Sequence, residues 1–311
     1  MNLGIARFEQ ENYRGAEEAF SRAAELDPKE ALTWMNLGSA RFHQGNYVGA
    51  EEASLRAVEL DPKEAPAWMN LGATRLLQEN YSGAEEALVR AVELDPKKAE
   101  PWMMLAVSRY ENYKFATAAE NLIMGISLDR KDLSGYSDLC KLYLRNNLAI
   151  EPKGVLGKAL SIEDTSDGFK SYILFLRAMI YLHGQDRIPF LGDLQEGINQ
   201  LENLEEESRR RLLGRLIDFL VDIMYPDILE EIRTYTESLR QFSPKLASVL
   251  DPLHYVLDYF KEYTSAEKKN GTSAIRAQRI LDNVPLELRG PVEEMVQKVH
   301  KNIIWWERRP R

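Results

Sequence analysis

Three consecutive copies of one 34-residue unit open the chain, and this repetition constrains the fold more than any single motif. Residues 1–34 match residues 35–68 at 25 of 34 positions, and residues 35–68 match residues 69–102 at 23 of 34. A unit of this length leaves an apolar face open, so the copies must stack to complete a core. The 311 residues therefore form either one elongated body or an array followed by a second body.

Each unit contains two helical patterns separated by a turn. Trp34, Leu37, Gly38 and Arg41 stand at i, i+3, i+4 and i+7, which is one stripe of an α-helix and predicts a first helix. The Gly-Asn pair at 45–46 ends it, and a second periodic run covers residues 47–60. The Asp-Pro pair at 61–62 ends the second helix because proline cannot continue the hydrogen-bond ladder. The unit is therefore predicted to be a helical hairpin.

The pattern W-x2-L-G, followed by Tyr, Ala, Ala and Pro at fixed offsets, resembles the tetratricopeptide repeat (TPR). The resemblance is strong over residues 1–102, weaker over residues 102–132 and poor over residues 133–164. It implies an all-α fold, a right-handed superhelix of helical hairpins with a concave inner surface. We therefore expect about five TPR-like repeats in residues 1–164, three strong and two degenerate.

The period is lost in residues 165–311, but helical patterning continues. This region forms either degenerate hairpins that continue the solenoid or a separate capping bundle. The segment at 264–272 is the expected loop or linker. The expected helices are Phe169–Leu182, Ile188–Leu201, Glu205–Met224, Ile228–Gln241, Lys245–Tyr263, Ser273–Asn283 and Pro291–Trp306.

Composition and charge favour a folded protein that binds other proteins. The chain is 44% hydrophobic and 29% charged, and it has neither an apolar run long enough to span a membrane nor a secretory leader, so we expect a cytoplasmic location. Its net charge of −9 argues against nucleic-acid binding. Residues 1–102 hold 18 acidic and 11 basic residues, a difference of −7, so a charged partner should be basic.

No motif for catalysis or for a cofactor is recognisable. The chain has no phosphate-binding glycine loop, no helix with metal-spaced histidines and a single cysteine, Cys140. Paired carboxylates recur in every copy of the unit, which indicates a feature of the repeat surface rather than a catalytic acid/base pair. Within the second helix of the unit, Glu52 with Arg56 and Glu86 with Arg90 are expected i, i+4 ion pairs. We expect no enzymatic activity, no cofactor and no metal.

One side of the first helix of each unit carries the candidate binding residues. In tetratricopeptide proteins this side lines the concave groove, so the resemblance places an asparagine ladder and a methionine row there. An amide can both donate to and accept from a peptide backbone, and methionine adapts to varied apolar side chains. Met104 replaces the asparagine in the fourth unit. The candidates are Asn2, Asn36, Asn70, Met35, Met69, Met103, Phe8, Phe42, His43 and Tyr110.

An arginine recurs seven residues after the tryptophan position, where the family usually has an aromatic residue: Arg7, Arg41, Arg75 and Arg109. One interpretation is that these side chains bury their stems along the helix pair and reach glutamates of the second helix. The other is a cationic ladder that faces into the groove.

These observations predict a protein-interaction scaffold that holds an extended peptide or a partner helix. An alternative is the recruiting arm of a larger enzyme or signalling protein, and a third is self-association through the open face of the N-terminal repeat. Met1 stands one position after the expected tryptophan, so we expect further repeats or another domain to precede it.

Overall fold

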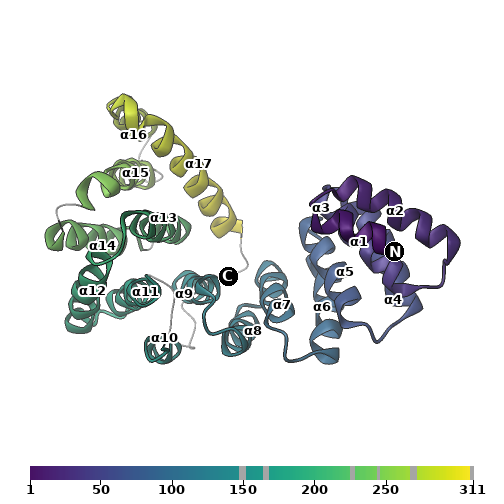
Figure 1. Cartoon of the computed structure of the whole chain (residues 1–311). Coiled ribbons are helices and arrows are strands. Elements are labelled where there is room, and N and C mark those ends of the chain that lie inside the picture. The colour runs from purple at the N-terminus through teal and green to yellow at the C-terminus, as the bar shows by residue number, and fades with distance from the viewer. Residues whose placement is uncertain (147–151, 164–167, 225–227, 244–245, 267–271, 309–311) are drawn as a thin grey trace. The chain divides into compact units, whose positions relative to one another are not determined.

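The computed structural model is built from α-helices and contains no strand among the residues it describes, which confirms the predicted all-α fold (Figure 1). It describes residues 1–146, 152–163, 168–224, 228–243, 246–266 and 272–308. The chain divides into two compact units, Met1–Asp129 (unit 1) and Arg130–Arg311 (unit 2). The grouping of residues 1–164 into five repeats stays a prediction.

Unit 1 consists of successive helical hairpins, and we name the first helix of each hairpin helix A and the second helix B. The predicted breaks at 45–46 and 61–62 are confirmed, because both pairs fall between helices. The helices of unit 1 are α1 (Asn2–Glu9), α2 (Tyr13–Leu26), α3 (Ala31–His43), α4 (Tyr47–Leu60), α5 (Ala65–Leu77), α6 (Tyr81–Leu94), α7 (Ala99–Glu111) and α8 (Phe115–Leu128).

The turn inside each hairpin has one backbone geometry. The residue before helix B caps it: Asn46 Oδ1 accepts from the Gly49 N–H at 3.0 Å, and Asn12 and Asn80 do the same in their own hairpins. Lys114 stands at this place in the fourth hairpin and makes no side-chain cap. The residue before the cap has a left-handed φ, +59° at Glu11, +76° at Gly45, +58° at Glu79 and +60° at Tyr113.

Small residues let helices A and B approach closely. A Cβ atom added at Gly72 would lie 2.5 Å from Leu88 Cγ, so α5 and α6 can keep this distance only with glycine. Helix B contributes alanines that are fully buried, such as Ala84 and Ala87. Leu88 then packs with Leu105 of the next hairpin, which carries the core from one repeat into the next.

The tryptophan that defines the repeat also holds the loop between hairpins. Trp34 Nε1 donates to the Pro28 carbonyl at 3.0 Å, and the same bond joins Trp68 to Pro62 and Trp102 to Pro96. Pro28, Pro62 and Pro96 each follow the aspartate at which helix B ends. The indole therefore fixes the loop that leads into its own helix A.

Three of the four recurring arginines, Arg41, Arg75 and Arg109, connect three helices each. Arg41 Nε donates to Glu17 Oε1 at 2.9 Å on helix B of the preceding hairpin, and Arg41 Nη1 donates to the Gly49 carbonyl at 3.1 Å on its own helix B. We call this arrangement an arginine staple. Arg75 repeats it with Glu51 and Gly83, and Arg109 binds Glu85 and Asn121. The interpretation that these arginines reach glutamates of helix B is confirmed for Arg41, Arg75 and Arg109, while Arg7 donates to the Gly15 carbonyl of its own helix B at 2.9 Å.

Hydrogen bonds favour the charged form of two staple carboxylates, Glu17 and Glu85. Burial raises the pKa of Glu17, but hydrogen bonds from Arg41 and Gln44 outweigh it and leave the pKa below its ordinary value. The pKa of Glu85 is likewise raised by burial and lowered, on balance, by hydrogen bonds from Lys114 and other donors. These two carboxylates therefore favour the folded state when they are ionised.

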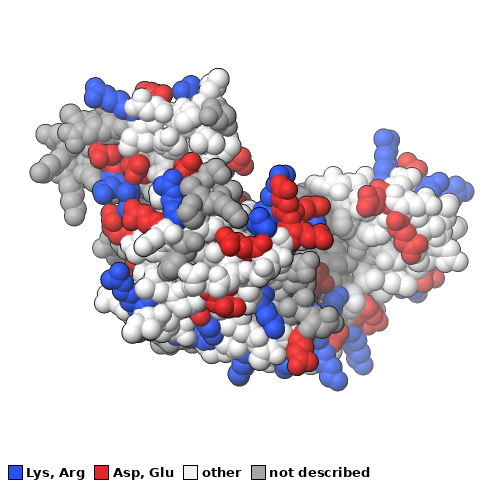
Figure 2. Space-filling model, turned by 60° about the vertical axis from the view of Figure 1, so that its left-hand side comes forward, with Lys and Arg blue, Asp and Glu red and all other residues white. Residues whose placement is uncertain are grey.

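The prediction of i, i+4 ion pairs on helix B is wrong. Arg56 contacts Glu59 at 3.0 Å and Arg90 contacts Glu93 at 2.8 Å, both at i, i+3 toward the helix C-terminus. Carboxylates at i−4 and i+3 are both neighbours of an arginine on a helix surface, so the rotamer chooses between them. Among the described residues on the face in Figure 2, acidic and basic side chains are interspersed.

Unit 2 is also helical, and most of the helices expected from the sequence are present within a few residues. The helix expected from Pro291 begins earlier, because the Leu288 N–H bonds to the Pro285 carbonyl and closes a first turn. Its helices are α9 (Leu133–Asn146), α10 (Lys153–Leu160), α11 (Phe169–His183), α12 (Arg187–Glu202), α13 (Glu206–Asp222), α14 (Leu229–Phe242), α15 (Ala247–Ala266), α16 (Thr272–Asp282) and α17 (Leu286–Arg308).

The segment expected as a loop at 264–272 is partly helical. Helix α15 runs on to Ala266 and α16 begins at Thr272, so the connection between them is short. Residues 267–271, the middle of the expected loop, lie outside the described residues.

Helices α11 and α12 form a hairpin with the same turn as the repeats. Gln185 has a φ of +61°, and the Asp186 N–H bonds to the Tyr181 carbonyl at 2.8 Å. In the second repeat the Asn46 N–H bonds to the Arg41 carbonyl at 3.0 Å in the same register. The repeat turn thus recurs in unit 2 without the Gly-Asn pair. None of the helices in the described part of the chain is long and apolar enough to cross a membrane.

Candidate peptide-binding pocket

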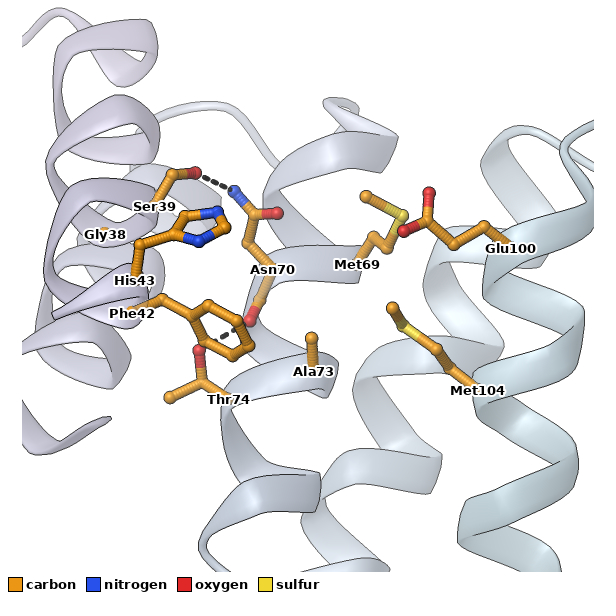
Figure 3. Close-up of a pocket in the computed structure, with 10 residues that line it drawn as sticks. All are labelled: Gly38, Ser39, Phe42, His43, Met69, Asn70, Ala73, Thr74, Glu100 and Met104. Carbon is orange, nitrogen blue, oxygen red and sulfur yellow. Dashed lines mark hydrogen bonds between the residues drawn. The ribbon is translucent and has the colours of Figure 1, made fainter. Parts of the chain in front are cut away.

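A pocket of about 210 Å³ opens on the A helices of unit 1 (Figure 3). Three successive A helices, α3, α5 and α7, form it, so residues far apart in the sequence meet there. We call it the α3–α5–α7 pocket. Its lining residues are Gly38, Ser39, Phe42, His43, Met69, Asn70, Ala73, Thr74, Glu100 and Met104.

The walls of the pocket differ in chemistry. The ring of Phe42 and the imidazole of His43 project from α3, while Met69 projects from α5 on the opposite side (Figure 3). Helix α7 adds Met104 and the carboxylate of Glu100 beside Met69 (Figure 3). Glu100 is more than half exposed and lies 3.4 Å from Lys98. The pocket thus has flexible apolar walls and one acidic edge.

The asparagines reach toward the preceding A helix. Asn70 Nδ2 donates to Ser39 Oγ at 2.8 Å, and the Asn70 carbonyl oxygen of the backbone accepts from Thr74 Oγ1 at 2.7 Å. The bond to Ser39 orients the amide so that its oxygen Oδ1 faces the pocket (Figure 3). Asn36 Nδ2 contacts Met1 Sδ on the preceding A helix at 3.7 Å. In both side-chain amides, the Nδ2 group therefore already contacts another side chain of the protein.

Aromatic rings support the α3 wall. The His43 imidazole stacks on Tyr13 with 4.7 Å between ring centroids and 13° between planes. Phe8 meets His43 edge-on at 5.3 Å, and Phe42 meets Tyr47 of its own hairpin at 5.7 Å. Phe8 therefore holds His43 in place and is not among the lining residues.

The structure brings four of the ten predicted residues to the pocket: Phe42, His43, Met69 and Asn70. Asn2 is exposed on α1, and Met35 packs against the core cluster around Leu71. Met103 packs against α8, since a Cβ at Gly125 would lie 2.5 Å from its sulfur. Tyr110 contacts Phe115 at 5.6 Å in its own hairpin.

Several lining residues were not among the predicted site residues, and the repeat register could have indicated them. Met104 stands one repeat after Asn70, and Glu100 stands one repeat after Pro66. Ser39 and Ala73 are related in the same way. A comparison of all groove-facing positions over three repeats would have found these residues, whereas one unit alone does not show them. Among the described residues, no three His, Cys, Asp or Glu side chains come close enough to share a metal ion.

Comparison with known proteins agrees with this geometry. A sequence model of the family described as tetratricopeptide repeat matches residues 1–65 and, again, residues 54–99. Residues 1–99 are tetratricopeptide repeats. The staples, the tryptophan–proline bonds and the capped turns described above are thus features of TPR hairpins in this chain. No curated protein matches the sequence.

One solved TPR structure shares the fold, and two others are similar over part of the chain. The C-terminal part of a TPR repeat-containing protein from Cytophaga hutchinsonii is 12% identical, with a TM-score of 0.57 over 80% of this chain and 98% of that chain. MamA is 24% identical, with a TM-score of 0.47 over 51% of this chain and 87% of its own. YrrB, a TPR protein described as having an unusual peptide-binding site, is 18% identical, with a TM-score of 0.47 over 63% of this chain and 97% of its own.

Proposed function

We propose that this chain is a non-enzymatic scaffold that binds an extended peptide segment of another protein across the α3–α5–α7 pocket. The observation that carries the proposal is the pocket itself, which combines apolar walls with a fixed amide oxygen (Figure 3). A site of this kind suits a peptide, because backbone bonds supply affinity and a side-chain pocket supplies specificity.

The lining residues indicate what such a peptide offers. Phe42, Met69 and Met104 would enclose one apolar side chain, and methionine tolerates several shapes of side chain. Asn70 Oδ1 would accept a backbone N–H of the peptide. Glu100 would attract a basic residue next to the apolar one, in agreement with the acidic excess of residues 1–102.

The test fills the pocket without removing a hydrogen bond. Ala73 lines the pocket, so Ala73→Phe should block it, whereas Ala116→Phe places the same ring on an exposed position of α8. Both full-length variants and the wild-type chain are labelled and incubated with one peptide array. We expect the wild-type pattern to survive in Ala116→Phe and to be lost in Ala73→Phe. An unchanged pattern in a folded Ala73→Phe variant would exclude this pocket.

The asparagine ladder is tested separately. Asn36 and Asn70 are replaced together by Ala, and folding is checked by circular dichroism. We expect peptides bound by the wild-type chain to lose at least about tenfold in affinity, the equivalent of one or two hydrogen bonds. Unchanged affinities would leave the pocket in place but would remove the ladder. The cytoplasmic location and the self-association through the N-terminal face stay predictions.

A further inference from the structure

Helix α17 lies against two helices of unit 2 as a bound peptide helix would lie in a groove. It returns from α16 and runs along α15 and α13 (Figure 1). From these contacts we infer that α13 and α15 form a second, helix-binding surface, and that α17 is an intramolecular occupant that an amphipathic helix of a partner protein can replace.

The apolar contact of α17 is one narrow stripe. Val292, Val296 and Val299 are buried and stand at i, i+4 and i+7, so they share one face of the helix. The opposite face is exposed at Glu293, Glu294, Gln297 and Lys301. Over residues 292–302, the stripe of three valines and the polar opposite face have the pattern of a groove-bound helix, whose anchors recur at this spacing.

His300 extends the stripe on the side of α15. Its Nε2 atom lies 3.1 Å from the Tyr259 hydroxyl oxygen, and its ring meets Phe260 edge-on at 5.0 Å. Both aromatic residues belong to α15. The α15 side of the surface therefore recognises one amphipathic ring by shape and by one hydrogen bond.

The C-terminal end of α13 provides the polar contacts. Lys298 Nζ lies 2.7 Å from Asp222 Oδ1 and 3.6 Å from Asp218 Oδ1. Asn302 Nδ2 approaches the backbone carbonyls of Val221 and Asp222 at 3.3 and 3.4 Å. The Val221 carbonyl also accepts from the Met224 N–H at 3.2 Å, and the Asp222 carbonyl accepts from Arg145, so Asn302 shares these acceptors with other groups of unit 2.

The surface also has contacts that do not involve α17. Lys141 Nζ of α9 lies 2.9 Å from Asp222 Oδ2, so this carboxylate retains a cationic partner. Leu216, Leu220 and other apolar residues of α13 are buried in unit 2, as are Leu253 and Phe260 of α15. The acidic end of α13 is thus held by α9 independently of its contact with α17.

A weak point near the start of α17 allows the rest of the helix to leave. Arg289 Nη2 bonds to the Asp282 carbonyl at 3.3 Å, which ties the first turn of α17 to α16. Gly290 has open space where a side chain would stand, and Pro291, inside the helix, has no N–H to donate. Gly-Pro at this place weakens the helix between its tethered first turn and the valine stripe.

The partner helix follows from these contacts. It carries three β-branched apolar residues at i, i+4 and i+7, a basic residue at i+6 and an amide at i+10, the spacing of Val292, Val296, Val299, Lys298 and Asn302. The basic residue and the amide meet the acidic end of α13. Such a helix must displace α17, so its apparent affinity for the chain is lower than its affinity for the uncovered surface.

The experiment adds a fluorescein-labelled synthetic helix of residues 286–308 to the full-length chain and measures fluorescence polarisation. Lys298→Glu in the chain loosens α17 but leaves the α13 surface unchanged. Lys301→Glu makes the same charge change on the exposed face and is the matched control. We expect Lys298→Glu to bind the labelled helix at least about tenfold more tightly than the wild-type chain, and Lys301→Glu to match the wild type. Equal affinities in all three chains would overturn the inference.

Two further measurements separate an occupant from a core helix. A labelled helix that itself carries Lys298→Glu should lose its binding to the Lys298→Glu chain. In the wild-type chain, amide hydrogens of residues 292–302 should exchange at least about tenfold faster than those of α13. Exchange at the same rate as α13, or loss of the helical signal in the folded-state spectrum of the Lys298→Glu chain, would show that α17 belongs to the core and would contradict the inference.

Discussion

The arginine staples show how one side chain can set the geometry between repeats. Apolar stacking is non-directional, so it brings hairpins together without defining their angle. Arg75 contributes a bond in each of two directions, 2.8 Å to Glu51 on the preceding helix B and 3.1 Å to the Gly83 carbonyl on its own. The series ends with Arg109, since the corresponding arginine and glutamate positions of the next copy hold Tyr143 and Ala119.

Removal of one staple should destabilise unit 1. Arg75→Met keeps most of the buried stem but leaves Glu51 without its hydrogen-bonded cation, and we expect a loss of about 2 kcal/mol in the free energy of unfolding. Arg56→Met removes an exposed i, i+3 pair and should change it by less than about 0.5 kcal/mol. Urea unfolding followed by circular dichroism measures both variants. Equal effects would mean that the staple is only a surface ion pair.

The staple carboxylates also predict a pH dependence. Because the folded-state pKa of Glu85 is lowered, its contribution is complete above the ordinary pKa of a glutamate and is lost as the pH falls through the lowered value. Glu85→Gln should therefore destabilise the chain at pH 7 by about 1–2 kcal/mol. The difference from wild type should shrink toward pH 3, as the wild-type carboxylate takes up a proton and loses its charge. Glu86→Gln, at the exposed neighbouring position, is the control. A penalty that is the same at both pH values would contradict this account.

At the scale of helices, the decisive requirement is close approach of helix A to helix B. Gly72→Ala should improve the intrinsic helix propensity of α5 yet destabilise the chain by about 1–3 kcal/mol, because its Cβ would meet Leu88 Cγ at 2.5 Å. Gly214→Ala in α13 has open space and should stabilise the chain by up to about 1 kcal/mol. Thermal unfolding of both variants measures the opposite signs. Stabilisation by Gly72→Ala would show that the hairpin is packed less closely than the structure indicates.

The repeat period made the helices of unit 1 predictable, because every copy carries its breakers at the same offsets. The gap between the expected helices Phe169–Leu182 and Ile188–Leu201 located the turn between α11 and α12, but its identity with the repeat turn was not predictable. Gln185 takes the left-handed position there, and Asp186 makes no side-chain cap. Backbone bonds alone define this turn. A pattern of side chains could not reveal a geometry that unrelated residues adopt.

The pocket was predictable only in part, because copies of the repeat differ in their packing. Phe42, His43, Met69 and Asn70 follow from one unit and the family resemblance. Met103 has the same register as Met69 but packs at Gly125 of α8. The space beside a small residue decided the direction of this methionine.

In the repeat register, Gly125 corresponds to Ala57 and Ala91, so helix B of the fourth hairpin is smaller at this point by one methyl group. The sulfur of Met103 fills the space, which removes this methionine from the groove. Met35, whose counterpart of Gly125 is Ala57, also packs against the core, so the methionines of this register differ in direction between copies.

At the scale of the whole molecule, the two compact units use one kind of building block for two surfaces. Unit 1 offers the α3–α5–α7 pocket, which is open, and unit 2 has the surface of α13 and α15, on which α17 lies. A scaffold with one open surface and one covered surface can hold one partner while the second awaits a competing helix. The central claim is that the open pocket binds peptide.

Methionine-methyl NMR tests this claim most directly, because the pocket contains Met69 and Met104 while Met124 is exposed on α8, outside it. The full-length chain, labelled at its methionine methyl groups, is titrated with a peptide selected on the array. We expect the signals of Met69 and Met104 to shift in proportion to occupancy, and that of Met124 to stay in place. Binding without a shift at Met69 and Met104 would contradict the account.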